Sequence, residues 1–126
     1  MRYEDAPDVK RLVEEIVLKL ELRHIPPGGI LCLRSYGSKA RWTTARIHSL
    51  SRAWQNALKL EPRYLIEVIS ERYDRLSEEG KEKTVIHELL HIPEGFKGGF
   101  RPHKGWVTSR RIDELYRRLK SSPGAQ

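Results

Sequence analysis

Apolar residues near the start of the chain recur at the spacing of a helix. They stand at positions i, i+3, i+4, i+7, i+8 and i+11: Val9, Leu12, Val13, Ile16, Val17 and Leu20. This spacing places them on one face of an α-helix that the chain enters near Pro7. Pro26 and Pro27 lack backbone donors, and the two glycines that follow favour a turn. The pattern therefore predicts an amphipathic N-terminal helix that ends before this turn.

Three short apolar segments predict the strands of a sheet. The first, ILCLR, begins at Ile30, and a second strand is expected at residues 44–48 after the basic loop SYGSKARW. The third, RYLIEVIS at residues 63–70, alternates most clearly. Between the second and third strands, SRAWQNALKL predicts a short helix that begins after Ser49 or Ser51 and is closed by a proline.

Two more helices are predicted in the second half of the chain. Ser77 is a suitable N-cap, and the two glutamates after it fall where the helix dipole favours negative charge. This helix ends where Pro93 cannot continue it. A last amphipathic helix is marked by Ile112, Leu115, Tyr116 and Leu119. The elements together predict an α+β fold in which a short mixed sheet packs against the N-terminal helix and the helix of residues 77–93, with a further C-terminal helix.

Length and composition indicate one domain over residues 1–126. The chain has 38% hydrophobic and 33% charged residues, and we expect only the tail at residues 121–126 to be flexible. No window approaches the apolar length of a membrane span, and the charged start does not match a secretory signal, which favours a cytoplasmic protein. The lone Cys32 lies in an apolar segment, where a buried thiol is expected.

Positive charge gathers near the C-terminus. The net charge of the chain is +7, and eight lysines or arginines against two acidic residues lie at residues 97–120. Two interpretations stay open: a solvated helix face, or a surface for an acidic partner such as nucleic acid.

The helix predicted from Ser77 contains the motif HELLH. With about 100° per residue, His91 lies about 40° from His87 on the helix, and the apolar Ile86, Leu89 and Leu90 fall elsewhere on the wheel. Side chains four residues apart can therefore bind one ion. Glu88 flanks that face and is well placed to act on a water molecule held by the ion. The motif predicts a catalytic zinc (Zn2+) site.

A catalytic zinc ion usually has three protein ligands, so a third ligand is expected outside the motif. His103 follows a glycine-rich loop that can fold back, and it is the preferred candidate. His48 and His24 remain alternatives. Glu114 has the position of a carboxylate ligand, but on the last helix it points away from the apolar side, and Asp113 is only slightly better placed.

The segments TVIHELLH and RPHKGW, with the final helix after them, resemble the small zinc metallopeptidases of prokaryotes and phages. The layout is similar to that of SprT-like and minimal-gluzincin zincins. The resemblance implies a zincin-like domain in which His87, His91 and His103 bind zinc and Glu88 is the general base. It also implies a peptide or protein substrate.

We therefore predict a zinc-dependent metallopeptidase. Candidates for stabilising the oxyanion are Arg101, His48 and Tyr73, and the strand RYLIEVIS either accepts a peptide as an added strand or is an interior strand. The alternative is a nucleic-acid-associated basic protein with a structural or vestigial zinc site, which would use the C-terminal segment and the loop containing Tyr36 and Trp42.

Overall fold

A four-stranded mixed sheet forms the centre of the computed structural model, which describes residues 1–102 and 105–121. The strand order is β1-β2-β4-β3, with β1 antiparallel to β2, β2 parallel to β4, and β3 antiparallel to β4. The strands are β1 (Arg2–Asp5), β2 (Ile30–Tyr36), β3 (Ala45–Ser49) and β4 (Tyr64–Ile69). The predicted α+β fold with a mixed sheet is confirmed.

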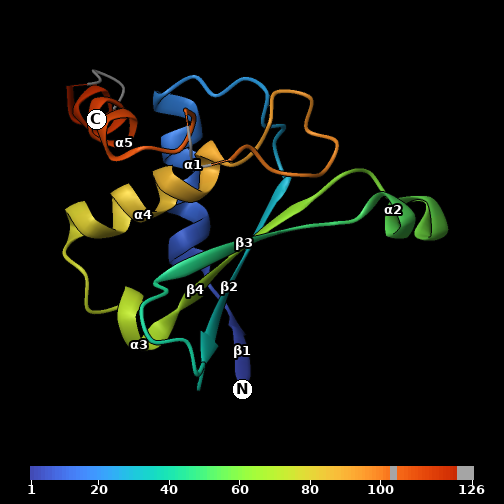
Figure 1. Ribbon diagram of the computed structural model, residues 1–126, viewed down its shortest axis with the longest axis horizontal. Helices are drawn as coiled ribbons and strands as arrows, with labels where there is room; N and C mark the ends of the chain where they lie inside the picture. Colours follow the sequence, from blue (N-terminus) through green and yellow to red (C-terminus); the bar gives the residue numbers. More distant parts are fainter. Residues whose placement is uncertain (103–104, 122–126) are drawn as a thin grey trace.

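The helices are α1 (Pro7–Lys19), α2 (Arg52–Leu58), α3 (Ser70–Tyr73), α4 (Glu78–Leu90) and α5 (Ser109–Ser121). Figure 1 shows α1 and α4 packed together against the sheet, with α5 on the outer side of α4. In the same view α2 projects from the far end of β3 and β4. The sheet, α4 and α5 thus form successive layers.

Apolar side chains from the predicted helix stripes and strands fill the space between the sheet and the helices. From α1, Val9, Val13 and Ile16 are all buried, as the spacing of the sequence predicts. The fully buried Ile66 of β4 and Ile86 of α4 belong to the same core. Burial of this apolar surface is the main stabilisation of the arrangement.

The start of α4 is set by a side-chain cap. Ser77 is extended, and its hydroxyl accepts a hydrogen bond from the backbone N–H of Gly80 at 3.1 Å. The helix ends at Leu90, with His91 as C-cap and Pro93 two residues beyond. The predicted limits of the motif-bearing helix are confirmed, because both depend on local signals.

Two short elements were not expected from the sequence. The strand β1 is exposed at all four residues and shows no alternation, yet it pairs with β2. Helix α3 is a single turn after β4. Arg34 joins β2 to α1 and to the end of α3. Its guanidinium donates to Asp8 of α1 at 2.9 Å and to Asp74 after α3 at 2.8 Å.

The strand of residues 63–70 is an interior strand. β4 pairs with β2 on one side and β3 on the other, so it cannot accept a peptide as an added strand, and that option from the sequence is wrong. The outer strands of the described sheet are β1 and β3. A peptide can be added only at an outer strand.

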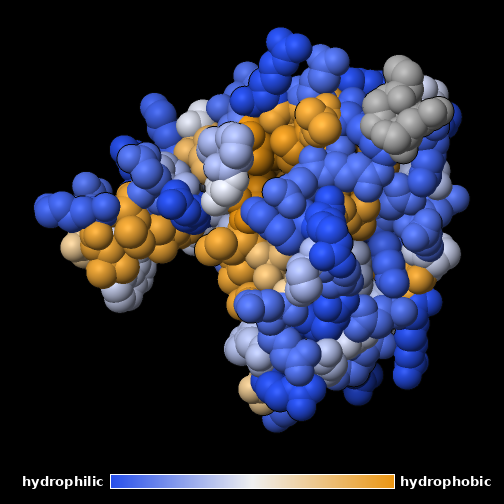
Figure 2. Space-filling model, turned by 180° about the vertical axis from the view of Figure 1, so that it is seen from behind, coloured by the Kyte–Doolittle hydropathy of each residue, from blue (hydrophilic) through white to orange (hydrophobic). Residues whose placement is uncertain are grey.

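Helix α2 carries exposed apolar side chains. None of its residues is buried, and Trp54 and Leu58 are more than half exposed. In Figure 2, seen from behind, the projecting arm at the left bears a patch of apolar surface. Among the described residues, no helix has the length and apolar character needed to cross a membrane.

Candidate metal centre and substrate groove

The end of α4 brings two histidines and a glutamate together. The imidazole rings of His87 and His91 have centroids 5.2 Å apart, as expected for side chains one turn apart on one helix face. One donor atom from each of His87, Glu88 and His91 lies within 4.8 Å of the other two. The three side chains can therefore approach one cation.

The ring of His91 is oriented by the backbone of Arg101. Its Nδ1 lies 2.8 Å from the Arg101 carbonyl oxygen, and a carbonyl oxygen can only accept, so Nδ1 carries a proton and donates. In the neutral ring Nε2 then bears the lone pair, which is the arrangement that outer hydrogen bonds give to metal-binding histidines. The Arg101 backbone N–H also donates to the His91 carbonyl oxygen at 2.7 Å.

Glu88 is a buried carboxyl group. The residue is 6% exposed, and burial raises the pKa of its side chain to about 7. No lysine or arginine forms an ion pair with Glu88 within the described ranges. A buried carboxylate beside two imidazoles is a donor set that suits a divalent cation, which would supply the missing positive charge. The residues present therefore fit a metal ion.

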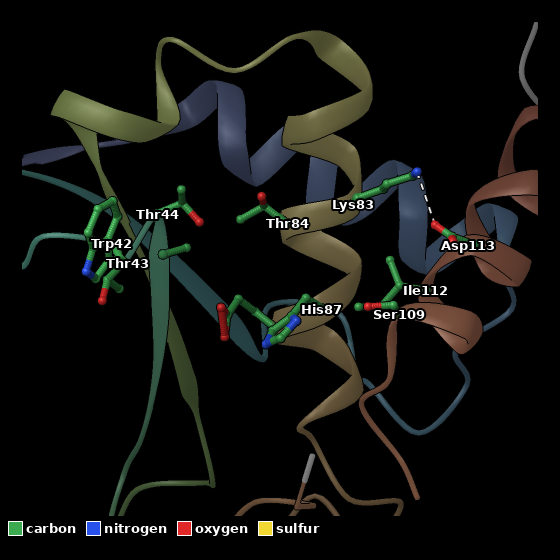
Figure 3. A pocket seen from close by; sticks show the side chains of 11 residues that line it. Trp42, Thr43, Thr44, Lys83, Thr84, His87, Ser109, Ile112 and Asp113 are labelled. Carbon is green, nitrogen blue, oxygen red and sulfur yellow. Dashed lines mark ion pairs between the residues drawn. The ribbon is translucent and has the colours of Figure 1, made fainter. Parts of the chain in front are cut away.

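A groove of about 400 Å³ opens beside these residues. Figure 3 shows its walls: Trp42, Thr43 and Thr44 from the segment before β3, then Lys83, Thr84 and His87 from α4, then Ser109, Ile112 and Asp113 from α5. Ala45 and Glu88 complete the lining. The groove brings together three parts of the chain that are far apart in sequence.

The C-terminal side of the groove is held by an ion pair. Lys83 Nζ lies 3.1 Å from Asp113 Oδ1 and 2.9 Å from Glu79 Oε2, and it also lies over the ring of Tyr116. The pair joins α4 to α5 at the rim of the groove (Figure 3). Asp113 is therefore engaged by Lys83 rather than by the two histidines.

The other histidines named from the sequence lie elsewhere or cannot be placed. His48 projects from β3 and its Nε2 lies 2.8 Å from Glu67 Oε1. His24 lines a different cavity, between α1, α4 and α5. His103 lies outside the described residues, so its prediction as third ligand is not tested by the structure.

Glu114 is exposed and points away from the groove, as the helical wheel predicts. Its carboxylate lies 3.4 Å from Arg110 Nε on the same helix. Within the described part of the chain, the group that could hold a metal consists of His87, Glu88 and His91. The carboxylate alternative for the third ligand therefore has no support in the geometry.

None of the three oxyanion candidates lines the groove as described. Arg101 has its guanidinium over the Trp106 ring, 4.5 Å from the centroid, and Tyr73 is 1% exposed beside the Arg34 network. His48 pairs with Glu67. The structure does not place any of them beside Glu88.

The sequence did not identify residues 42–45 as a wall of the groove. Trp42 is 88% exposed and appeared in the sequence only as an aromatic residue in a basic loop. Its contribution to the groove depends on β3 lying beside α4, which is a long-range contact without a local pattern. A tryptophan in a basic loop just before a predicted strand is the feature of the sequence that drew attention to this segment.

A mixed sheet with a helix that carries two histidines and a buried glutamate beside a groove is the arrangement of a metal-dependent peptidase. The chain matches the family described as "Putative phage metallopeptidase" over residues 1–119, and it belongs to that family. No curated protein and no solved structure matches the chain. Membership in a metallopeptidase family implies a metal ion, and the donor set on α4 agrees with that implication.

Proposed function

We propose that the protein is a zinc-dependent peptidase of the zincin type, with the SprT-like or minimal-gluzincin layout that its motifs resemble. His87 and His91 bind the metal, His103 is the third ligand, and Glu88 is the general base. The observation that carries this proposal is the position of Glu88: a buried carboxyl group between two imidazoles, at the wall of a groove.

Imidazole ligands suit zinc among several transition metals, and zinc when bound would acidify water and polarise a peptide carbonyl. Glu88 takes the proton of the attacking water on a carboxylate oxygen and later gives it to the leaving amine. Burial raises the pKa of this carboxyl group to about 7 in the metal-free protein, and a cation bound nearby would lower it, which would leave the group ionised and able to take the proton. The Arg101 carbonyl keeps His91 in the Nδ1–H form throughout.

An extended peptide is the substrate form that the groove suits best. The groove begins at residues 42–45, where β3 starts, and the side of β3 away from β4 has no strand partner in the described sheet. A peptide laid along this side can form strand-type hydrogen bonds while its scissile bond lies near Glu88. Ile112 and Ala45 offer apolar contact to a side chain in the groove.

One experiment on four proteins tests this function. Wild type, His91→Ala, Glu88→Gln and Glu114→Gln are loaded with zinc, and their metal content and their cleavage of a peptide library are measured. We expect about one zinc ion per chain in wild type, and a loss of zinc in His91→Ala. Glu88→Gln should keep zinc and lose turnover by about 100-fold or more, because the general base is removed.

The Glu114→Gln variant is the matched control. It makes the same change at an exposed carboxylate that pairs with Arg110, so both zinc and turnover should stay at the wild-type level. The assignment as a peptidase is wrong if the library contains no peptide that zinc-loaded wild type cleaves and Glu88→Gln leaves uncut. If wild type does not retain zinc at all, the assignment of the metal site is wrong as well.

A further inference from the structure

The hydroxyl group of Tyr64 is hydrogen-bonded to the loop that follows α4. Tyr64 is the first residue of β4 and is fully buried. Its hydroxyl donates to the Gly99 carbonyl oxygen at 3.0 Å and accepts from the Gly98 backbone N–H at 3.1 Å. One side chain from the sheet therefore satisfies two neighbouring backbone groups of this loop.

The aromatic rings next to this hydroxyl continue towards the metal centre. The Tyr64 ring makes an edge contact with Phe100 at 5.9 Å between centroids, and the Phe100 ring lies 6.4 Å from that of His91. On the other side, Phe96 packs on Tyr64 at 5.0 Å. Tyr64 and His91 thus both contact Phe100 of the same loop.

The end of the loop is bound to His91. Arg101 donates its backbone N–H to the His91 carbonyl, and its own carbonyl accepts the Nδ1 proton of His91. Residues 98 and 99 are bonded to Tyr64, and residue 101 is bonded to His91, so two residues at most separate one anchor from the other. A shift of the loop at Gly99 would move the acceptor of the His91 ring.

The loop does not hold this shape through its own residues. Gly98 and Gly99 have φ of +111° and +79°, which glycine adopts freely and other residues rarely adopt. Two adjacent glycines also give the loop many alternative conformations when it is not held. The bonds to Tyr64, together with the bond from Gln55 Nε2 to the Lys97 carbonyl, favour the conformation that places the Arg101 carbonyl.

We propose that Tyr64 is a positioning residue of the metal site: its hydroxyl fixes the loop at residues 98–101, and the loop fixes the tautomer and orientation of the His91 ring. The role rests on the proposed function, in which His91 binds zinc through Nε2. Tyr64 itself touches neither metal nor substrate, and it acts through the Arg101 carbonyl. Its loss leaves the donor set complete but less well oriented.

The test compares Tyr64→Phe with Tyr73→Phe, which also removes a hydroxyl from a buried tyrosine but lies at α3, away from the loop. The imidazole nitrogens of metal-free protein are observed by ¹⁵N NMR at a pH where His91 is neutral. We expect His91 in wild type and in Tyr73→Phe to be the Nδ1–H form. In Tyr64→Phe we expect a mixture of both tautomers.

Zinc affinity is the second measurement, by competition with a chelating dye. Removing the direct hydrogen-bonding partner of a metal ligand typically weakens binding by about 10-fold or more. Tyr64 acts on that partner through the loop, so we expect a smaller weakening of about 3- to 10-fold in Tyr64→Phe and none in Tyr73→Phe. Gly99→Ala is an independent variant, because a Cβ there meets no atom within 4 Å but forces an unfavourable φ on the loop. It should weaken zinc binding while leaving Tyr64 in place.

The outcomes separate this role from the proposed function. If wild type binds no zinc, the metal site fails, whatever the tautomer of His91. If wild type binds zinc and Tyr64→Phe matches it in both affinity and tautomer, the positioning role is wrong. Equal weakening in Tyr64→Phe and Tyr73→Phe would also overturn it, since both would then act through general stability.

Discussion

Two buried glutamates show how neighbouring groups set the chemistry of a carboxylate. Glu67 on β4 is 2% exposed, and burial opposes its ionisation, but hydrogen bonds led by those from Arg46 outweigh burial and lower its pKa to about 2. Glu88 on α4 is buried without such donors among residues 1–102 and 105–121, and its pKa rises to about 7. The first is a fixed negative charge of the sheet, while the second can exchange a proton near neutral pH.

Glu67 should make the fold sensitive to acid. Its pKa in the folded protein lies below the ordinary value of 4.5, so its contribution is complete above about pH 5 and is lost as pH falls towards 2. The shift corresponds to about 3 kcal/mol of unfolding free energy. We expect Glu67→Gln to be less stable than wild type at neutral pH and to have a shallower loss of stability between about pH 5 and 2.

Urea denaturation at a series of pH values measures this difference. Arg46→Met provides a second comparison, because it removes the main donor to Glu67 and should move the acid-sensitive range to higher pH. Parallel pH profiles for wild type and Glu67→Gln would contradict the role of Glu67.

At the scale of elements, α4 is unusual in being covered on two sides. Val85, Ile86 and Leu89 are buried where α4 packs among the sheet, α1 and α5, and Glu82 pairs with Lys120 of α5. Its hydrophobic pattern is therefore less one-sided than that of a surface helix. The end signals of α4 and its motif, rather than its periodicity, made it recognisable in the sequence.

The cap of α4 offers a prediction for this element. Ser77→Ala removes the acceptor for the Gly80 N–H, and an N-cap serine typically contributes about 1 kcal/mol. We expect the unfolding free energy of Ser77→Ala to fall by about this amount in chemical denaturation. Ser77→Asn keeps an acceptor at the same position and should stay near wild type. Equal losses in both variants would show that the cap is not the cause.

Most elements could be predicted from the sequence because their signals are local. The stripe of α1, the alternation of β4 and the cap of α4 all lie within a few residues of the structure that they specify. Strand β1 could not be predicted, since its four exposed residues are held only by pairing with the distant β2. The same reason explains which parts of the site could be predicted. The positions of His87, Glu88 and His91 relative to one another are given by one helix. The burial of Glu88 and the wall at Trp42 depend on neighbours far away in the chain.

On the scale of the whole molecule, positive charge and the groove occupy different sides of α5. Ser109, Ile112 and Asp113 line the groove, while Arg110, Arg111, Arg117 and Arg118 are all exposed. These arginines are exposed to an acidic partner, which is the alternative function considered from the sequence, although Arg110 also pairs with Glu114 and Arg118 donates to the Leu20 carbonyl. The separation allows the two functions to be tested independently.

Replacing Arg110, Arg111, Arg117 and Arg118 with glutamine should leave zinc-dependent peptide cleavage within about 2-fold of wild type, because none of the four lines the groove. Binding to duplex DNA, measured over a range of salt concentrations, should weaken and become less dependent on salt. A loss of peptide cleavage with zinc content unchanged would mean that the arginine side of α5 belongs to the active site.

The walls of the groove are synthesised in sequence order, and the wall from α5 is the last. Residues 42–45 and helix α4 leave the ribosome before α5, which supplies the wall with Ile112 and Asp113. A nascent chain can therefore present the two histidines of α4 while the groove is still open on one side. Because substrate must be held in position for efficient cleavage, we expect the growing chain to cleave peptides poorly until α5 has docked.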